Sequence, residues 1–401
     1  MKIPETTSDL SSSIDIMLVH LIATSRRPVS RTDLANITGL SKMAVGNHVS
    51  TLLKKGILSQ EESRANPNGS LGRHPVYLKL SSTSPCILGV LIKRNYCQAV
   101  LTNISGEIID MEKILFPQSL TAESLLALLF KMTDSIISHS QRQIIGCGIS
   151  CIGPINNITG CILNPPDFYG IENLPIVSAF EEHTGLSTYL VQDANAGGLA
   201  EKLYGRGIPY DDFMYLHIEN GIGLSFILNG SLFTGFSGQS GEIGHTSINF
   251  NGPKCTCGNT GCLELYANLN QMQDKISQLL PIFKESPFHK IKNPDWNQIL
   301  SLASDKDPIA IAALDEFCGY LAHALANVLT LLDFSTIIVG YNYDHGSDII
   351  EKMLGTRLRH FLRSSSEDIK ILHSQLGGNA PLIGSAAIVA NEVFQQRLWK
   401  I

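Results

Sequence analysis

Long apolar runs are scarce in this chain of 401 residues. None reaches the length of about 18 residues that a membrane-spanning helix needs. The first residues lack the basic-then-apolar pattern of a secretory signal, because Glu5, Asp9 and Asp15 interrupt it. We therefore expect a cytoplasmic protein with no membrane partner. A hydrophobic content of 44% and a length of 401 residues predict a soluble chain of two or three domains.

The nine cysteines show no pattern of a disulfide framework, which is rare in large cytosolic proteins. Six of them lie among apolar or small residues and are expected to fill the core. These six are Cys86, Cys97, Cys147, Cys151, Cys161 and Cys318. The other three lie close together in the sequence and predict a different role.

Negative charge predominates overall, with a formal net charge of −6, but it is unevenly distributed. Residues 1–80 contain ten Lys/Arg and six Asp/Glu, whereas the remainder contains 20 basic and 30 acidic residues. A basic segment on an acidic body is the asymmetry expected when only that segment contacts nucleic-acid phosphates.

Three helices are predicted within residues 1–80. Residues Ser13–Ala23 are a continuous apolar stretch. Ser30 is a natural N-cap for a second helix, which ends near Gly39, a residue suited to a left-handed turn. A third helix is expected from Ser41 through Lys55. Any three short amphipathic helices would give a similar pattern, so the segment that follows decides the interpretation.

That segment predicts a β-wing. Gly56 ends the third helix, residues 59–68 are polar, residues 69–72 form a turn, and Arg73–Leu78 returns as a strand. Helix, turn, helix and hairpin in this order predict a winged helix-turn-helix DNA-binding domain over residues 1–80.

The third helix would enter the major groove. We expect its buried face to comprise Met43, Val45, Val49, Leu52 and Leu53. Lys42 and Asn47 have the chemistry to contact guanine and adenine edges, and Arg64 and Arg73 of the wing would lie near phosphates or a narrow minor groove. The candidate DNA-binding residues are Ser41, Lys42, Asn47, His48, Thr51, Arg64 and Arg73.

Residues 85–401 alternate strand-like and helical segments, which predicts an α/β fold, in two lobes. The expected strands are Ile87–Ile92, Gln98–Thr102, Ile144–Ile149, Tyr189–Val191, Phe213–Ile218, Leu224–Leu228 and Thr336–Val339. The expected helices are Ala122–His139, Ile176–Thr184, Ala194–Tyr204, Asn268–Leu280, Pro308–Leu332 and Leu382–Phe394.

The most specific motif in the chain combines one histidine and three cysteines, His245, Cys255, Cys257 and Cys262, within eighteen residues. One imidazole and three thiolates supply the four tetrahedral ligands that zinc prefers. With all four positions filled by protein, the zinc is expected to be structural. The alternative is a set of unrelated reduced cysteines.

Residues 241–268, GEIGHTSINFNGPKCTCGNTGCLELYAN, resemble the signature of the ROK family of repressors, open reading frames and kinases. The segments Gly146–Pro154, Val191–Asn195 and Gly221–Gly244 are also similar to that family. The resemblance covers essentially the whole chain, because family repressors place a winged helix-turn-helix before this body. It implies an actin/hexokinase-like (ribonuclease H-like) body, with a small lobe of about 85–200 plus 382–401 and a large lobe of about 200–380.

The resemblance also implies a sugar site. Asp193 matches the general base of family kinases, and Glu242, His245 and Glu264 match residues that contact sugar hydroxyls. Gln192 stands where the family usually has asparagine, and we expect this longer amide to alter the pocket. From the residues alone, Asp193 could equally cap a loop, and Glu264 could lie on a surface helix.

The nucleotide site of the family is degraded here. Family kinases hold ATP phosphates with an Asp-x-Gly-Gly-Thr loop, but Leu91 replaces the acid, and Lys93 and Arg94 replace the glycines. Glu219 occupies the second phosphate loop, and Gly340-Tyr341 stands at the adenosine-side Gly-Gly. This pattern favours a sensor over an enzyme.

The sequence therefore predicts a sugar-responsive transcriptional repressor of carbohydrate metabolism genes, with zinc as its cofactor. Its expected partners are operator DNA, a sugar effector and further copies of itself, in a homodimer or dimer of dimers. Two alternatives are an ATP-dependent sugar kinase with an appended DNA-binding domain, and a repressor titrated by a sugar-transporter protein.

Overall fold

The computed structural model describes residues 7–62, 76–219, 221–343, 348–362 and 369–395. Its contacts divide the chain into two compact units. Unit 1 comprises Met1–Ser150, Pro175–Leu190 and Ser385–Ile401, and unit 2 comprises Cys151–Leu174 and Val191–Gly384. Unit 1 thus groups the N-terminal segment with part of the body, so the domain boundaries expected from the sequence stay a prediction.

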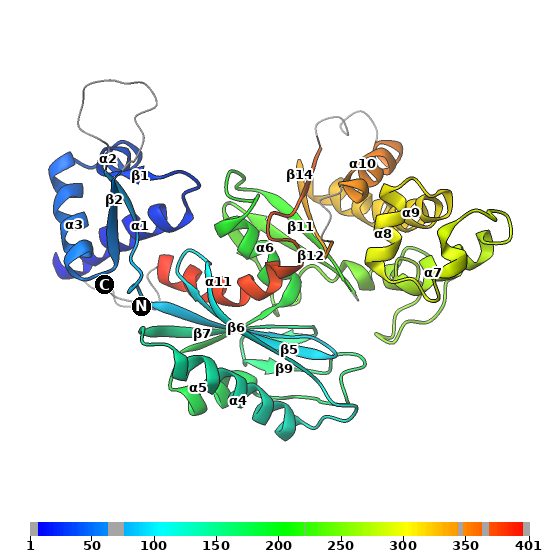
Figure 1. Cartoon of the computed structure of the whole chain (residues 1–401), viewed down its shortest axis with the longest axis horizontal. Helices are drawn as coiled ribbons and strands as arrows, with labels where there is room; N and C mark the ends of the chain where they lie inside the picture. The colour runs from blue at the N-terminus through cyan, green and yellow to red at the C-terminus, as the bar shows by residue number, and fades with distance from the viewer. Residues whose placement is uncertain (1–6, 63–75, 220, 344–347, 363–368, 396–401) are drawn as a thin grey trace. The chain divides into compact units, whose positions relative to one another are not determined.

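The N-terminal segment of unit 1 contains three helices and a small sheet in the order β1-β3-β2 (Figure 1). The elements are α1 (Thr7–Thr24), β1 (Val29–Ser30), α2 (Arg31–Thr38), α3 (Lys42–Lys54), β2 (Leu58–Glu62) and β3 (Val76–Leu80). Strands β2 and β3 pair antiparallel and follow α3 as a wing would. Residues 63–75 lie outside the described part of the chain, and with them the predicted wing residues Arg64 and Arg73.

Local capping explains where α2 and α3 begin and end. The Ser30 hydroxyl accepts a hydrogen bond from the Asp33 N–H at 3.2 Å, and the Asp33 carboxylate accepts one from the Ser30 N–H at 2.8 Å. This capping box satisfies two backbone donors that the helix itself leaves unpaired. Gly39 ends α2 with φ 71°, a left-handed conformation that favours glycine. The Ser41 hydroxyl caps α3 through the Ala44 N–H.

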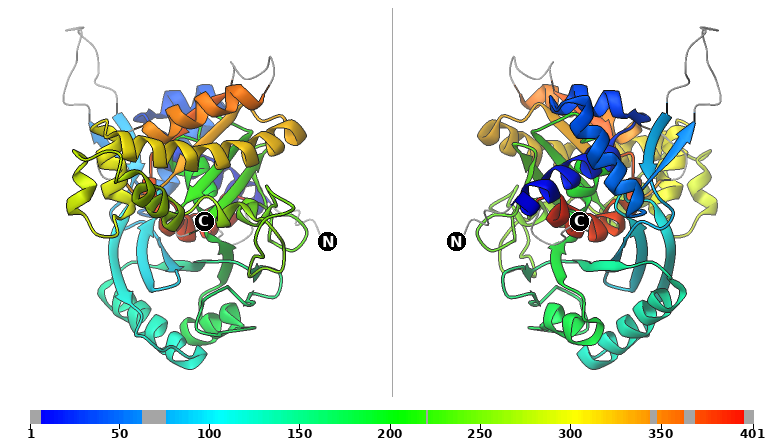
Figure 2. Two further views of the ribbon diagram at one scale, coloured as in Figure 1. Left: turned by 90° about the vertical axis from the view of Figure 1, so that its right-hand side faces the viewer. Right: turned by 90° about the vertical axis from the view of Figure 1, so that its left-hand side faces the viewer.

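The rest of unit 1 is built on a five-stranded sheet in the order β10-β7-β4-β5-β6. Its strands are β4 (Cys86–Ile92), β5 (Tyr96–Asn103), β6 (Ile108–Leu115), β7 (Ile144–Cys151) and β10 (Thr188–Gln192), the last of which continues into unit 2. Helices α4 (Ala122–His139) and α5 (Ile176–Thr184) lie on one face, and α11 (Ala380–Phe394) lies on the other (Figures 1 and 2). A Cβ at Gly89 or Gly148 would collide with α11, so these glycines permit its close packing.

Unit 2 contains a second five-stranded sheet, ordered β13-β12-β11-β14-β15. Its strands are β11 (Phe213–Ile218), β12 (Ile222–Leu228), β13 (Ser231–Phe233), β14 (Thr336–Gly340) and β15 (Lys370–His373), and a small hairpin pairs β8 (Ile155–Asn156) with β9 (Cys161–Ile162). Strand β11 is antiparallel to β12 and parallel to β14, which makes the sheet mixed.

Helices cover both faces of this sheet. They are α6 (Asp193–Tyr204), α7 (Leu269–Leu279), α8 (Trp296–Ser304), α9 (Pro308–Leu332) and α10 (Ile349–Phe361), with short 3₁₀ turns η1 (Ile243–His245), η2 (Leu263–Leu265), η3 (Pro287–Lys290) and η5 (Gly377–Asn379). Alternate residues of β11 face opposite sides: Met214 and Leu216 pack in the core with α9, whereas Phe213 and Tyr215 belong to a separate cluster.

Helix α9 is long and apolar enough to cross a membrane by length and composition, and 61% of its most apolar window is buried within the protein. The apolar stretch contains Asp315 and Glu316, so it is not an unbroken apolar run. Burial of this extent is what a central core helix of unit 2 shows, and such helices pass the same test of length and hydropathy.

Candidate functional site

Three of the DNA-binding side chains predicted on α3 are accessible to solvent. Lys42, Asn47 and Thr51 are exposed, as is Ser41 at the N-cap. The buried positions Val45, Val49 and Leu52 hold the opposite face against the core of the segment.

Two predictions for α3 are wrong. Met43 was expected in the buried face, but it is 76% exposed, because it lies two residues before Val45 and helical rotation places it on the other side. His48 was expected to point outward, but its Nδ1 lies 2.8 Å from the Asp15 carboxylate of α1, and that carboxylate is almost fully buried. While this pair holds, the His48 Nδ1 is not available for a base contact. Nothing in the local sequence signals it, since the two residues are 33 positions apart.

Four of the five predicted sugar-site residues lie on two adjoining segments of unit 2, and the fifth, Glu264, lies in η2. Gln192 is the N-cap of α6 and Asp193 is its first residue, while Glu242 is the N-cap of η1 and His245 is its last residue. The Gln192 Nε2 donates to Glu242 Oε1 at 2.6 Å, which joins the two segments. Burial raises the pKa of the Glu242 carboxyl.

Gln192 leaves one buried acceptor open. Its Oε1 is buried and has no hydrogen-bond partner in the described part of the chain. A buried acceptor without a partner costs about 1–3 kcal/mol, which a ligand hydroxyl would remove by donating to it. Gly153 lies against the same amide, because a Cβ there would stand 2.9 Å from Gln192 Nε2.

The first residue of β12 holds the Glu264 carboxylate in place. Its Oε1 accepts the Ile222 N–H at 3.0 Å, and a Cβ at Gly244 would lie 2.7 Å from the same oxygen. Sequence reasoning did not identify Ile222, since a backbone donor 42 positions away leaves no sequence signal. Gly241, with φ 91°, lets the segment before η1 lie directly against Leu224 of β12. The glycines of the motif therefore position the carboxylates of Glu242 and Glu264.

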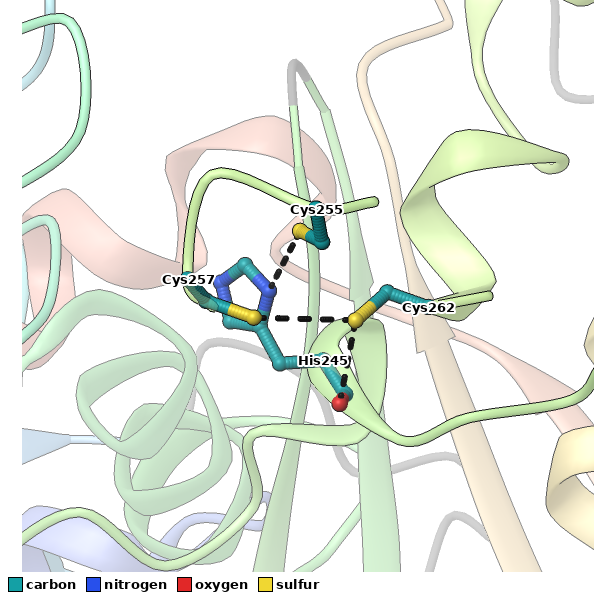
Figure 3. A group of neighbouring side chains, drawn as sticks. All are labelled: His245, Cys255, Cys257 and Cys262. Carbon is teal, nitrogen blue, oxygen red and sulfur yellow. Dashed lines mark hydrogen bonds between the residues drawn. The ribbon is translucent and has the colours of Figure 1, made fainter. Parts of the chain in front are cut away.

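The predicted metal ligands come together in unit 2 (Figure 3). The ligand atoms of His245, Cys255, Cys257 and Cys262 all lie within 4.8 Å of one another. The Cys255 Sγ is 3.8 Å from His245 Nδ1, and the Cys257 Sγ is 3.6 Å from Cys262 Sγ. With zinc bonds of about 2.0–2.3 Å, tetrahedral ligand atoms stand about 3.6–3.8 Å apart, so this donor set fits a tetrahedral zinc ion.

The thiols of this cluster differ in acidity. Burial opposes ionisation of Cys255, but hydrogen bonds involving Cys257 and His245 outweigh it and lower the pKa of that thiol to about 7. Burial, reinforced by the neighbouring thiols, raises the pKa of Cys262 to about 12. A bound dication would stabilise all three thiolates at neutral pH.

The segments where the family resemblance predicts phosphate-binding loops make other contacts in this chain. Leu91 is buried within β4, and the Lys93 N–H bonds to the Tyr96 carbonyl, which makes a tight β4–β5 turn at the position of the first phosphate loop. Glu219 lies at the β11–β12 turn, with its Oε2 3.3 Å from His217 Nε2. These residues remove the acid and the glycines that a phosphate-binding loop would need.

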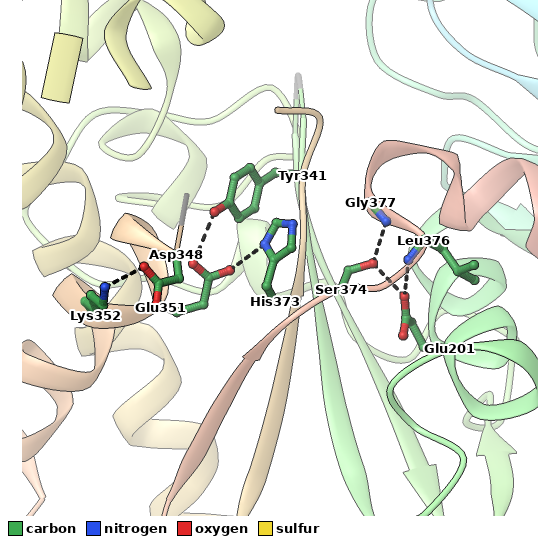
Figure 4. Close-up of polar contacts among 9 residues, drawn as sticks. All are labelled: Glu201, Tyr341, Asp348, Glu351, Lys352, His373, Ser374, Leu376 and Gly377. Carbon is green, nitrogen blue, oxygen red and sulfur yellow. Dashed lines mark hydrogen bonds and ion pairs between the residues drawn. The ribbon is translucent and has the colours of Figure 1, made fainter. Parts of the chain in front are cut away.

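The adenosine-side segment carries a buried polar network (Figure 4). The Tyr341 hydroxyl donates to Glu351 at 3.1 Å, and the His373 Nδ1 lies 2.9 Å from the other Glu351 oxygen. Beside it, the buried Glu201 accepts hydrogen bonds from the Ser374 hydroxyl and the Leu376 N–H. Tyr341 is thus fixed in the space that a glycine would leave open.

Residues 87–392 match the ROK family. The chain belongs to this family. The xylose repressor of Bacillus spizizenii is 30% identical over 369 residues, which cover 90% of this chain and 91% of that protein. A solved ROK family transcriptional regulator, a homolog of the Escherichia coli MLC protein, superposes with a TM-score of 0.78 and 24% identity, covering 97% of this chain and 98% of its own.

A ROK family glucokinase from Streptomyces griseus, solved with glucose and AMPPNP, gives a TM-score of 0.64 at 24% identity over 76% of this chain and 98% of its own. The regulator match therefore extends into the N-terminal segment, whereas the kinase match has about the length of the body. The predicted α/β fold with an actin-like ROK body is confirmed, and the N-terminal helices and strands follow the order expected of a winged helix-turn-helix.

Proposed function

We propose that this chain is a sugar-responsive, DNA-binding transcriptional repressor of the cytoplasm, with structural zinc. The observation that carries the proposal is a helix-turn-helix in the same chain as a ROK body whose sugar-site amide, Gln192, has an open buried acceptor. The xylose repressor of Bacillus spizizenii, which aligns over most of both chains, supports the same role.

DNA binding is assigned to α3 and the basic segment around it. Lys42, Asn47 and Thr51 are exposed and present donors and acceptors to solvent, which is what reading of base edges in the major groove requires. The excess of basic residues in 1–80 supplies the attraction to phosphates. Two such segments in a homodimer, or more in a dimer of dimers, would bind a palindrome.

Sugar binding is assigned to Gln192, Asp193, Glu242, His245 and Glu264. The carboxylates accept hydrogen bonds from hydroxyls, and the open Gln192 oxygen accepts one more. Zinc, when bound by His245 and the three cysteines, supplies structural rigidity to the segment between η1 and η2. The fixed ring of His245 and the adjoining Glu242 then present a preorganised surface to the sugar.

The experiment that tests this function joins two measurements. Purified chain is incubated with sheared genomic DNA to recover its operator, and thermal-shift screening of mono- and disaccharides identifies the effector. We expect a palindromic operator whose affinity at fixed salt changes when the effector is added. Recovery of no preferred sequence, or an operator affinity that no stabilising sugar alters, would contradict the proposal.

The same chain is not expected to act as a kinase. With Leu91 in β4, a Lys93 turn and Glu219 at the second loop, it should show no ATP binding at millimolar concentration and no sugar-dependent ADP release. A coupled ADP assay tests this. ADP release that disappears in Asp193→Asn would support the kinase alternative instead.

A further inference from the structure

Unit 2 contains a pocket of about 480 Å³ whose lining includes Glu219, the residue at the expected second phosphate loop. It is lined by residues that include Glu219, Glu264, Asn270, Trp296, Asn297 and Asn342. Its volume lies in the range of about 300–1,000 Å³ that small-molecule sites occupy. Because this chain lacks the acid and the glycines of the family's phosphate-binding loops, we consider a ligand other than a nucleotide for this pocket.

The charges of the lining disfavour a nucleotide. Among the described residues, the pocket lining includes two acidic residues, Glu219 and Glu264, and no lysine or arginine. A triphosphate would meet two like charges without a compensating cation, and electrostatic repulsion would oppose it. An uncharged ligand meets no such penalty.

The polar groups of the lining match a carbohydrate. Asn270, Asn297 and Asn342 are exposed, and their amides make no hydrogen bond within the part of the chain that is described. Each amide offers two donors and an acceptor, which suits neighbouring hydroxyls that both donate and accept.

An aromatic ring completes this wall. The Trp296 indole stands edge-on to Phe317 at 5.3 Å between centroids and to Tyr341 at 6.3 Å. Tyr341 is itself held by Glu351. A fixed indole gives an apolar surface for the C–H face of a sugar ring, beside amides that bind its hydroxyls.

Glu264 connects this pocket with the sugar site. Its carboxylate lies against Gly244, between Glu242 and His245, and the residue also lines the pocket. We propose that the pocket is a second sugar subsite, so that the effector is a saccharide of at least two units, one at Gln192–Glu264 and the next beside Trp296. This inference rests on the proposed function, since it presumes that the first unit binds at the ROK sugar site.

The fluorescence of Trp296 can report binding in the pocket. The chain has two tryptophans, Trp296 and Trp399, so Trp399→Phe leaves Trp296 alone. In this background, calorimetry and tryptophan emission are followed with three pairs of probes: xylose and xylobiose, glucose and cellobiose, and N-acetylglucosamine and chitobiose. We expect one disaccharide to bind at least about tenfold tighter than its monosaccharide, a gain of about 1.4 kcal/mol, and to change Trp296 emission.

Substitutions in the pocket test whether its residues cause the tighter binding of the disaccharide. Asn297→Ala and Asn342→Ala should bring the disaccharide down to the affinity of its monosaccharide, which should itself bind unchanged. Gln278→Ala, an exposed amide of α7 outside the pocket, is the matched control and should alter neither.

The two proposals fail differently. If a monosaccharide binds but its disaccharide binds no tighter or leaves Trp296 emission unchanged, the second subsite is wrong and the proposed function stands. A change of Trp296 emission on adding AMPPNP would also contradict the proposed subsite, because it would indicate that the pocket binds a nucleotide. If no saccharide of either size binds, both proposals fall.

Discussion

At the scale of single residues, the His373–Glu351 pair gives the protein a specific pH dependence. The hydrogen bond with Glu351 raises the pKa of His373 above its ordinary value. The pair therefore stabilises the fold fully below the ordinary histidine pKa of about 6.5, and this contribution is lost as pH rises through the raised folded-state value. His373→Gln should lose about 1 kcal/mol at about pH 6 and much less at about pH 9.

Thermal unfolding at the two pH values measures this difference. His360→Gln, which removes an exposed histidine of α10, is the control and should leave the melting temperature and its pH dependence near those of the wild type. Equal destabilisation by His373→Gln at both pH values would show that the pair contributes no pH-dependent stability.

Residue identity predicted the metal ligands better than the surface of α3. His245 and the three cysteines follow from ligand chemistry and short spacing, which are both local. The pairing of His48 with Asp15 and the hydrogen bond from Ile222 to Glu264 join distant segments. Such tertiary pairings have no local signal, and a single sequence carries no record of them.

At the scale of elements, all six central strands of the two five-stranded sheets were predicted, but three of their four edge strands were not. The bounds of α4, α5 and α9 match the predicted ranges, because their apolar periodicity or a capping residue is strong. Within these two sheets the unpredicted strands are β6, β13 and β15, which all lie at edges, while the fourth edge strand, β10, was predicted. Edge strands alternate buried and exposed residues or are short, so they lack the apolar run that identifies a central strand.

The segment between η1 and η2 should depend on metal. Elemental analysis should find about one zinc per chain, and Cys257→Ser should lose the metal and much of the sugar response, since the same segment positions His245 and Glu264. Cys161→Ser, a cysteine outside the cluster, is the matched control and should keep both. Purified protein that is folded and sugar-responsive without metal would contradict the assignment.

Two substitutions in α3 should distinguish base contacts from attraction to phosphates. Lys42→Ala should cost about 1–3 kcal/mol on the operator and much less on random DNA if this side chain contacts a base. Lys54→Ala, at the other end of the helix, should weaken both DNAs by a similar, smaller amount. Titration of operator and random duplexes at one salt concentration makes the comparison, and equal losses on both DNAs for Lys42→Ala would remove it from base reading.

At the scale of the whole molecule, two of the five proposed sugar-site residues lie close along the chain to a passage between the two units. The chain passes between them four times, after Ser150, Leu174, Leu190 and Gly384. Gln192 and Asp193 follow the third passage, and Gly153 follows the first. A ligand that fixes these residues acts beside the segments that any change between the units must use.

For sugar binding to change operator affinity, the sugar must bind one state of the protein better than the other. Coupling of this kind typically amounts to about 1–3 kcal/mol, or about a 5- to 150-fold change in operator affinity. The α3 side chains proposed to contact DNA and the proposed sugar-site residues belong to different units. A substitution that abolishes sugar binding should therefore leave operator affinity intact and remove its response to sugar.

The most direct test of the account is operator affinity at fixed salt, with and without the effector sugar, for the wild type and Asp193→Ala. The account predicts that both proteins bind the operator equally without sugar, and that only the wild type changes its affinity when sugar is added. A full sugar response in Asp193→Ala would contradict it, because the sensing site would then lie elsewhere.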